Sequence, residues 1–360
     1  MNLFSVLKIR WAALVFALTL LLSGGTPDTP QPGEAVQALQ AVLPLSQTSV
    51  TDQCDAVAAA YPKLFDHAAF GAVIPGLDQG FVPQGLGYSD ALSAYLISGY
   101  FSNGDLPSAF VIIDAVSGKA RKTLIFGDAD GEAQTGHFGG VAAHGAYIYA
   151  VCKTQLFVYD AGAARAARGG TVLPAMLVTE LPVQGSFCGA GGGVLWVGSF
   201  ENRAPSEPSA DPTEAAPADV PDPQGDMVGY RFSSFGPYGL CDPETPEYAA
   251  KIPALVQGVA CYGRGTFVFS CSYGRTRNSR LLVFRNRNPK TWNGEAVFSK
   301  EEASRTLTAP PMSEGLTTCP AGLAILFESG AALYRTDGGK NPLDRLVTVG
   351  WLALLNTNDF

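Results

Sequence analysis

The sequence has 360 residues, of which 47% are hydrophobic and 16% are charged. Its 24 basic and 32 acidic residues give a net charge of −8, which argues against nucleic acid or an anionic membrane as a partner. The length alone suggests two domains, but the chain repeats one unit five times at intervals near 50 residues, and five such units would use most of it as a single β-propeller.

Residues 1–38 are predicted to be a signal peptide and leader. Two basic residues precede an uncharged apolar run over 11–22. This run is too short to cross a hydrocarbon core, which needs about 20 residues, but it is typical of a secretory signal. Cleavage fits either Ser23-Gly24 or the small-residue site that ends at Ala38, and an uncleaved anchor is the alternative. We therefore expect a secreted or extracytoplasmic protein.

Three further regions follow from the composition. Residues 39–79 are expected to be an N-terminal capping segment, since helical periodicity is confined to the region near 50–66. Residues 80–355 are expected to form the propeller. Within them, 203–226 are rich in Pro, Ala and acidic residues and cannot bury enough apolar surface to become ordered. This insert is interpreted as a disordered surface loop, or alternatively as a lid over the axial mouth.

A polar-Gly-apolar unit recurs five times and opens a short apolar strand each time. Its intervals of roughly 45 to 73 residues are typical of propeller blades. The five openings are Gln84-Gly85-Leu86, Gly139-Gly140-Val141, Gln184-Gly185-Ser186, Gln257-Gly258-Val259 and Glu314-Gly315-Leu316.

The first repeat reads as a four-stranded blade. Its inner, second, third and outer strands are expected at 84–88, 94–100, 109–114 and 122–126. The turn over 114–119 contains Asp, Ser and Gly, which favour a tight hairpin. The chain is therefore predicted to be all-β.

The later repeats show the same order of apolar runs, with five four-stranded blades expected and six as the alternative. In the last repeat, 70–75 and 346–349 compete to close the ring. The expected second strands are 147–151, 194–198, 267–270 and 323–327, and the expected third strands are 156–160, 227–232, 281–285 and 332–335.

A family resemblance rests on the run 82–86, on Ile112-Ile113-Asp114 with Ser117-Gly118-Lys119, and on the Gln-Gly or Glu-Gly openings. These motifs resemble uncharacterised secreted bacterial β-propeller proteins, and they are more distantly similar to lactonase and gluconolactonase-like propellers. The second resemblance implies an axial metal, usually calcium, held by Glu, Asn and Asp. Calcium is only weakly supported, because a hard cation needs several charged oxygens and Glu314 is the one carboxylate among the five candidate positions.

Candidate ligand-binding residues belong to two sets. Polar side chains at the entrances of inner strands point to the axial mouth, unless they serve to satisfy backbone groups between blades. Aromatic and charged side chains in the loops after second strands suit sugars, peptides or carboxylates if these loops share one rim. The first set is Gln84, Gln184 and Gln257, and the second is Tyr100, Tyr273, Arg275 and Glu328.

Two functions remain open. The first is a binding module whose axial mouth takes an extracellular small molecule, glycan or protein, in a protein expected to be monomeric. The alternative is a lactonase-like or glycan-acting hydrolase centred on Glu314 with help from His137 and Glu201. Glu201 with Glu328 is a candidate acid/base pair. The nucleophile-elbow, phosphate-loop and zinc-protease motifs are missing from the sequence.

The seven cysteines of an exported chain predict some oxidation, and their odd number leaves at least one unpaired. Cys188, Cys261 and Cys319 occupy similar repeat positions and are expected to be small buried residues. Cys54 and Cys241 are the candidates for a disulfide.

Overall fold

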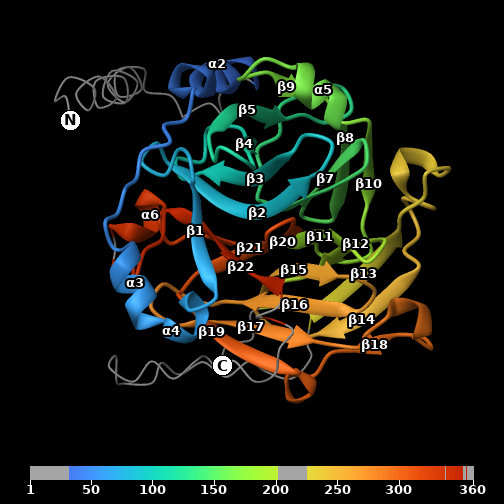
Figure 1. The fold of residues 1–360 in the computed structure, drawn as a ribbon. Helices are drawn as coiled ribbons and strands as arrows, with labels where there is room; N and C mark the ends of the chain where they lie inside the picture. Colours follow the sequence, from blue (N-terminus) through green and yellow to red (C-terminus); the bar gives the residue numbers. More distant parts are fainter. Residues whose placement is uncertain (1–31, 202–224, 337, 352–353, 355–360) are drawn as a thin grey trace, which may run out of the picture.

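The computed structural model describes residues 32–201, 225–336, 338–351 and 354. Within them, five mainly antiparallel sheets surround a central axis, which confirms the predicted five-bladed β-propeller (Figure 1). Each inner strand contacts the inner strands of both neighbouring blades, and the last contacts the first, so the ring is closed. The predicted signal peptide as far as residue 31, and the predicted insert as far as residue 224, lie outside the described residues. None of the described helices is long and apolar enough to cross a membrane.

Blade one has the strands that the sequence predicts. Asp114 Oδ1 accepts hydrogen bonds from the backbone N–H groups of Val116 at 3.0 Å and Ser117 at 2.7 Å, and Gly118 has a φ of +68°. These features close the hairpin between the third and fourth strands as expected. The sheet comprises β2 (Phe81–Ser89), β3 (Ala94–Phe101), β4 (Ala109–Asp114), β5 (Ala120–Phe126) and a short parallel fifth strand, β9 (Val172–Leu173).

Blades two to four repeat this order from the axis outward. Blade two comprises β6 (Phe138–His144), β7 (Tyr147–Cys152), β8 (Gln155–Asp160), the helix α5 (Ala161–Ala166) and β10 (Leu177–Glu180). Blade three comprises β11 (Phe187–Gly191), β12 (Val194–Gly198), β13 (Gly225–Arg231), η1 (Pro237–Gly239), β14 (Tyr248–Ile252) and the parallel β18 (Ala296–Val297). Blade four comprises β15 (Val256–Tyr262), β16 (Thr266–Cys271), β17 (Ser279–Phe284), η2 (Pro289–Thr291), η3 (Lys300–Glu302) and β19 (Arg305–Ala309).

Blade five departs from the prediction in its third strand. Residues 332–335 form the short helix α6 (Ala332–Arg335), in which Tyr334 N–H donates to Ala331 O at 2.9 Å, so local hydrogen bonds replace a ladder. The segments that were expected to compete for closure are both used, because β1 pairs with β22 and β22 with β21. The sheet comprises β20 (Ser313–Cys319), β21 (Gly322–Phe327), β22 (Arg345–Val349) and β1 (Ala68–Val73). The predicted capping segment therefore supplies one strand of the propeller.

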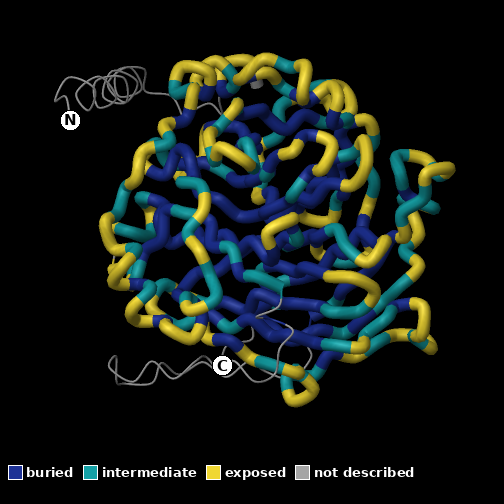
Figure 2. Tube along the Cα trace, viewed as in Figure 1, coloured by how far each residue is buried: buried dark blue, intermediate teal, exposed yellow. Residues whose placement is uncertain are grey.

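The remainder of the N-terminal segment packs on the outside of the ring. Leu39 of α2 (Pro32–Val42) is fully buried in a hydrophobic cluster that it shares with blade one. Figure 2 shows the buried core of the ring in dark blue. Helices α3 (Cys54–Ala60) and α4 (Pro62–Phe65) bury Val57 and Leu64 against strands of blades four and five. These contacts cover the outer edge of the ring where it closes.

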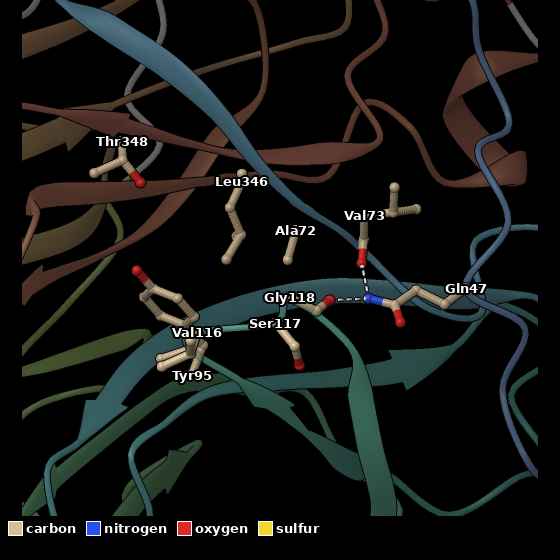
Figure 3. A pocket seen from close by; sticks show the side chains of 11 residues that line it. Gln47, Ala72, Val73, Tyr95, Val116, Ser117, Gly118, Leu346 and Thr348 are labelled. Carbon is tan, nitrogen blue, oxygen red and sulfur yellow. Dashed lines mark hydrogen bonds between the residues drawn. The ribbon is translucent and has the colours of Figure 1, made fainter.

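Gln47 ties the closing blade to the first blade. Its Nε2 donates to Val73 O at 2.8 Å and to Gly118 O at 2.6 Å, and its Oε1 accepts from Ala120 N–H at 2.8 Å. Figure 3 shows the side chain spanning from β1 to the β4–β5 turn, at one end of a cleft of about 490 Å³. One amide thus joins the N-terminal strand to the turn of the neighbouring blade.

All seven cysteines are free, so the predicted bridge between Cys54 and Cys241 is wrong. Cys54 packs on the cluster formed by α3, α4 and blades four and five. Cys241 lies in blade three, where its Sγ is 3.9 Å from Phe232 O. The expected burial of the three repeat-position cysteines is confirmed: Cys188, Cys261 and Cys319.

Candidate functional site at the axial mouth

The repeated polar residues are placed by β-bulges at the entrances of the inner strands. The register between the first and second strands shifts at Gln84, at Gln257 and across Glu314-Gly315. A bulge leaves one residue outside the ladder and redirects its side chain. The same position in three blades therefore presents a polar group beside the axis.

The glycine that follows has a packing reason. A Cβ on Gly315 would lie 2.3 Å from Leu86 N, and one on Gly140 would lie 2.2 Å from Cys188 N. Only a residue without a side chain lets the neighbouring inner strands approach this closely. The third repeat differs from the others, because Gln184 and Gly185 come before β11 begins. In this blade Ser186 is the residue that lies against Gly139 of the neighbouring inner strand.

Two buried carboxyl groups meet behind the mouth. Glu314 is 2% exposed at the start of β20, and Glu328 is 9% exposed directly after β21. Gln84 Nε2 donates to Glu328 Oε2 at 2.7 Å, and Gln257 Nε2 donates to Glu314 Oε1 at 3.1 Å. The two carboxyls are also close enough for the charge of Glu328 to raise the pKa of Glu314. The pair is thus held by amides from blades one and four.

Burial raises the pKa of both carboxyls, but unequally. Desolvation raises the pKa of Glu328 to about 7, against hydrogen bonds from Gln84, Glu314 and Tyr334 that lower it. For Glu314, desolvation and the adjacent Glu328 carboxylate hold the pKa well above its ordinary value. Two close carboxyls that cannot both ionise share a proton. The pair therefore holds a proton at a higher pH than an exposed carboxyl would.

A cavity of about 330 Å³ opens over this pair. Glu328 is among the residues that line it, whereas Glu314 lies behind Glu328 and is not. The group that a ligand can touch is therefore Glu328, although the sequence had pointed to Glu314. The lining residues are Gln84, His137, Lys153, Gln184, Gly185, Ser186, Phe200, Gln257, Glu328 and Tyr334.

Two lining residues of the cavity, Tyr334 and His137, both contact Tyr100, which together with Arg275 lies outside the lining. Tyr334 comes from α6, and its hydroxyl lies 3.3 Å from that of Tyr100. The Tyr100 ring packs on His137 with centroids 4.6 Å apart, and Arg275 lies over the Tyr334 ring at 5.0 Å. Desolvation lowers the pKa of His137, whose Nε2 contacts Gln84 Oε1. A neutral His137 thus helps to orient the amide that donates to Glu328.

The structure does not bring every predicted site residue to this cavity. Glu201 lines a neighbouring depression of about 410 Å³, which also involves Asp226 and Gln184. Tyr273 lies under Arg277, with the guanidinium 5.8 Å from its ring, and is not a lining residue of the axial cavity. The carboxyl partner of Glu328 is therefore Glu314, not Glu201.

Sequence reasoning missed Tyr334, Lys153, Ser186 and Phe200. The sequence predicts a strand over 332–335, whereas the structure has there the helix that places Tyr334 over the mouth. In blade three, the predicted unit begins at Gln184, two residues before Ser186, which occupies the equivalent position. A search for a polar residue just ahead of each inner strand would have found Ser186. Nothing in the sequence signals Lys153.

Among the described residues, no group of three or more His, Cys, Asp and Glu side chains is placed to hold a metal ion. The best candidates for metal-binding oxygens are those of Glu314 and Glu328 and of the amides of Gln84 and Gln257. Calcium binding thus stays a prediction from the resemblance.

No family model and no curated protein sequence matches the chain. Among solved structures, the glutaminyl cyclase of Myxococcus xanthus is 13% identical with a TM-score of 0.41, over 78% of this chain and 97% of that one. An oxidoreductase assigned as a glucose dehydrogenase from Thermus thermophilus is 14% identical with a TM-score of 0.40, over 78% and 99%. Likeness this distant carries no information on ligand or reaction. The fold assigned here rests on the sheet order and the closed ring.

Proposed function

We propose that the protein is a hydrolase that acts on ester or lactone carbonyls in the axial cavity, with Glu328 as its general base. The observation that carries this proposal is the buried pair of Glu314 and Glu328, of which only Glu328 reaches the cavity. Catalytic bases work best with a pKa near the working pH, and burial gives Glu328 a pKa of about 7. The N-terminal sequence supports action outside the cytoplasm.

In the proposed reaction, ionised Glu328 takes a proton from a water molecule as the water oxygen bonds to the substrate carbonyl carbon. The tetrahedral intermediate then breaks its bond to the leaving oxygen, which takes the proton back from Glu328. Acid and alcohol are the products. Glu314 lies beside Glu328, and its neighbouring carboxyl helps to keep the pKa of the pair above the ordinary carboxyl range.

The remaining lining groups fit the other needs of this chemistry. Amide N–H groups such as those of Gln184 and Gln257 can stabilise the oxygen that becomes negatively charged. Phe200 and Tyr334 offer ring faces to the apolar part of a substrate. Lys153 adds one positive charge at the exposed side of the cavity.

Glycan hydrolysis by a carboxylate pair is less well supported. Retaining glycosidases hold their two carboxyls about 5 Å apart and inverting ones hold them farther apart, so that the sugar or a water fits between. Here the carboxyls of Glu314 and Glu328 are near neighbours, and of the two only Glu328 lines the cavity. This arrangement suits a proton-sharing pair that acts from one side of the substrate.

A binding module without turnover, the leading interpretation of the sequence, would use the same amides and rings. The observation that favours catalysis over binding alone is the burial of two neighbouring carboxyls at the cavity, which raises the pKa of Glu328, because simple recognition needs no such pair.

The test is hydrolysis of a panel of aryl esters and γ- and δ-lactones by the mature protein and by Glu328→Gln, which keeps the shape and removes the base. Glu244→Gln makes the same chemical change at an exposed position and is the matched control. We expect turnover by the wild type and by Glu244→Gln, and a loss of at least a hundredfold in Glu328→Gln with unchanged circular dichroism. An inactive wild type that still binds panel members would establish the binding module instead, and an active Glu328→Gln would remove Glu328 from the mechanism.

A further inference from the structure

A second depression opens at the opposite end of the propeller axis. The inner strands run in the same direction, since Gly85 lies against Gly140 and Gly87 against Ala142, so their carboxyl ends share one face. These ends and the turns after them surround a depression of about 450 Å³, which we call the distal mouth. Its lining residues include Tyr88, Asp90, His144, the 191–193 turn, Phe232, Tyr262, Thr317, Thr318 and Trp351.

Aromatic rings from different blades line the distal mouth in stacked pairs. Phe232 stacks on His144 with centroids 3.9 Å apart and an interplanar angle of 15°. Tyr262 stacks on Trp351 at 4.2 Å and 22°, while Tyr262 remains 41% exposed. Rings that are already packed lose little freedom when a ligand covers them. The distal mouth therefore offers preformed flat apolar surfaces to a ligand.

Polar groups lie between these rings, and none of the lining residues is Lys or Arg. Thr318 supplies a partly exposed hydroxyl, whereas the buried Thr317 hydroxyl donates to Thr318 O at 3.4 Å. Asp90 supplies an exposed carboxylate, which can only accept hydrogen bonds when ionised. The 191–193 turn leaves backbone groups uncovered by side chains. Asp90 and the net charge of −8 disfavour an anion.

Apolar ring faces beside directed donors and acceptors match a molecule that has both apolar C–H faces and hydroxyl groups. We propose that the distal mouth is a binding site for a neutral saccharide. It is independent of the proposed hydrolase site, because inner strands of about seven residues at about 3.3 Å each separate the two mouths by about 20 Å. A ligand at one mouth leaves the other free.

The experiment is affinity gel electrophoresis of the mature protein in soluble neutral polysaccharides: a β-glucan, a xylan and a mannan. We expect retardation of the wild type in at least one of them, and an affinity at least tenfold lower for Tyr262→Ala. Phe235→Ala is the matched control, since it removes a fully exposed ring that does not line the depression, and it should migrate as the wild type does. Should Tyr262→Ala fail to fold, Thr318→Val tests the same site through a lost hydroxyl.

Absence of retardation in all three polysaccharides, or equal retardation of wild type and Tyr262→Ala, would overturn the proposal. An aromatic surface beside a carboxylate also suits a quaternary ammonium ion. Titration with choline, followed by NMR, tests this alternative. If the wild type binds choline but no saccharide, and Asp90→Asn no longer binds choline, the distal mouth is a cation site instead. In each case the hydrolase assay at the axial cavity is read separately with Glu328→Gln.

Discussion

Replacing Glu328 by Gln should change how the stability of the protein depends on pH. The fold raises the pKa of Glu328 from an ordinary 4.5 to about 7, so between these values the folded state binds a proton that the unfolded chain has lost. The free energy of unfolding must then fall as pH rises through this window, by about 1.4 kcal/mol per pH unit for each such carboxyl. Summed over the shift, Glu328 contributes about 3 kcal/mol below pH 4.5 that is absent above pH 7.

Glu314 acts in the same direction, because its pKa is also raised. Near pH 6 the wild type should therefore lose stability more steeply than Glu328→Gln, by about 1 kcal/mol per pH unit. Urea unfolding followed by tryptophan fluorescence at pH values from 4.5 to 7.5 measures this slope, with Glu244→Gln as the control that keeps the wild-type slope. Equal slopes in wild type and Glu328→Gln would mean that Glu328 titrates alike in the folded and the unfolded state, and would contradict a raised pKa of Glu328 in the folded protein.

Three other predictions concern the site, the ring and the N-terminus. The rate of hydrolysis should rise with pH, with a midpoint near 7. Gln84→Leu should move this midpoint upward, because it removes a hydrogen bond that favours the ionised form of Glu328. An unmoved midpoint would show that Gln84 does not lower the pKa of Glu328. In chemical denaturation, Gly315→Ala should lower the free energy of unfolding by about 1–3 kcal/mol, because the added Cβ would clash with the backbone of blade one. Gly169→Ala is the control and should lower it far less, because the nearest atom to its Cβ would be 3.7 Å away. Mass spectrometry of the exported protein should find cleavage near Ser23-Gly24 and not after Ala38, because the later site would divide α2, which packs on blade one.

The sequence predicted those parts of the fold that depend on local pattern. The apolar runs of blade one and the Asp114 turn became the expected strands and hairpin because strand alternation and turn chemistry act over a few residues. The polar-Gly unit was recognised, but its cause, a bulge beside a close backbone contact, is visible only in three dimensions.

The errors came from interactions between distant segments. Residues 332–335 have the composition of a strand, but β22 takes the ladder position beside β21, and β1 pairs with it from the other end of the chain. The same limit applies to the site. Glu314 and Glu328 were each noticed, yet only the return of β21 beside β20 shows that they form a pair.

Infrared difference spectroscopy would show directly whether Glu328 stays protonated beside Glu314 up to neutral pH. The protonated-carboxyl band of the wild type, minus that of Glu328→Gln, would be followed from pH 4 to 9. We expect a difference band that disappears with a midpoint near pH 7. A band already lost near the ordinary carboxyl value of 4.5 would show that Glu328 is an unperturbed acid, and would contradict the proposed catalytic role.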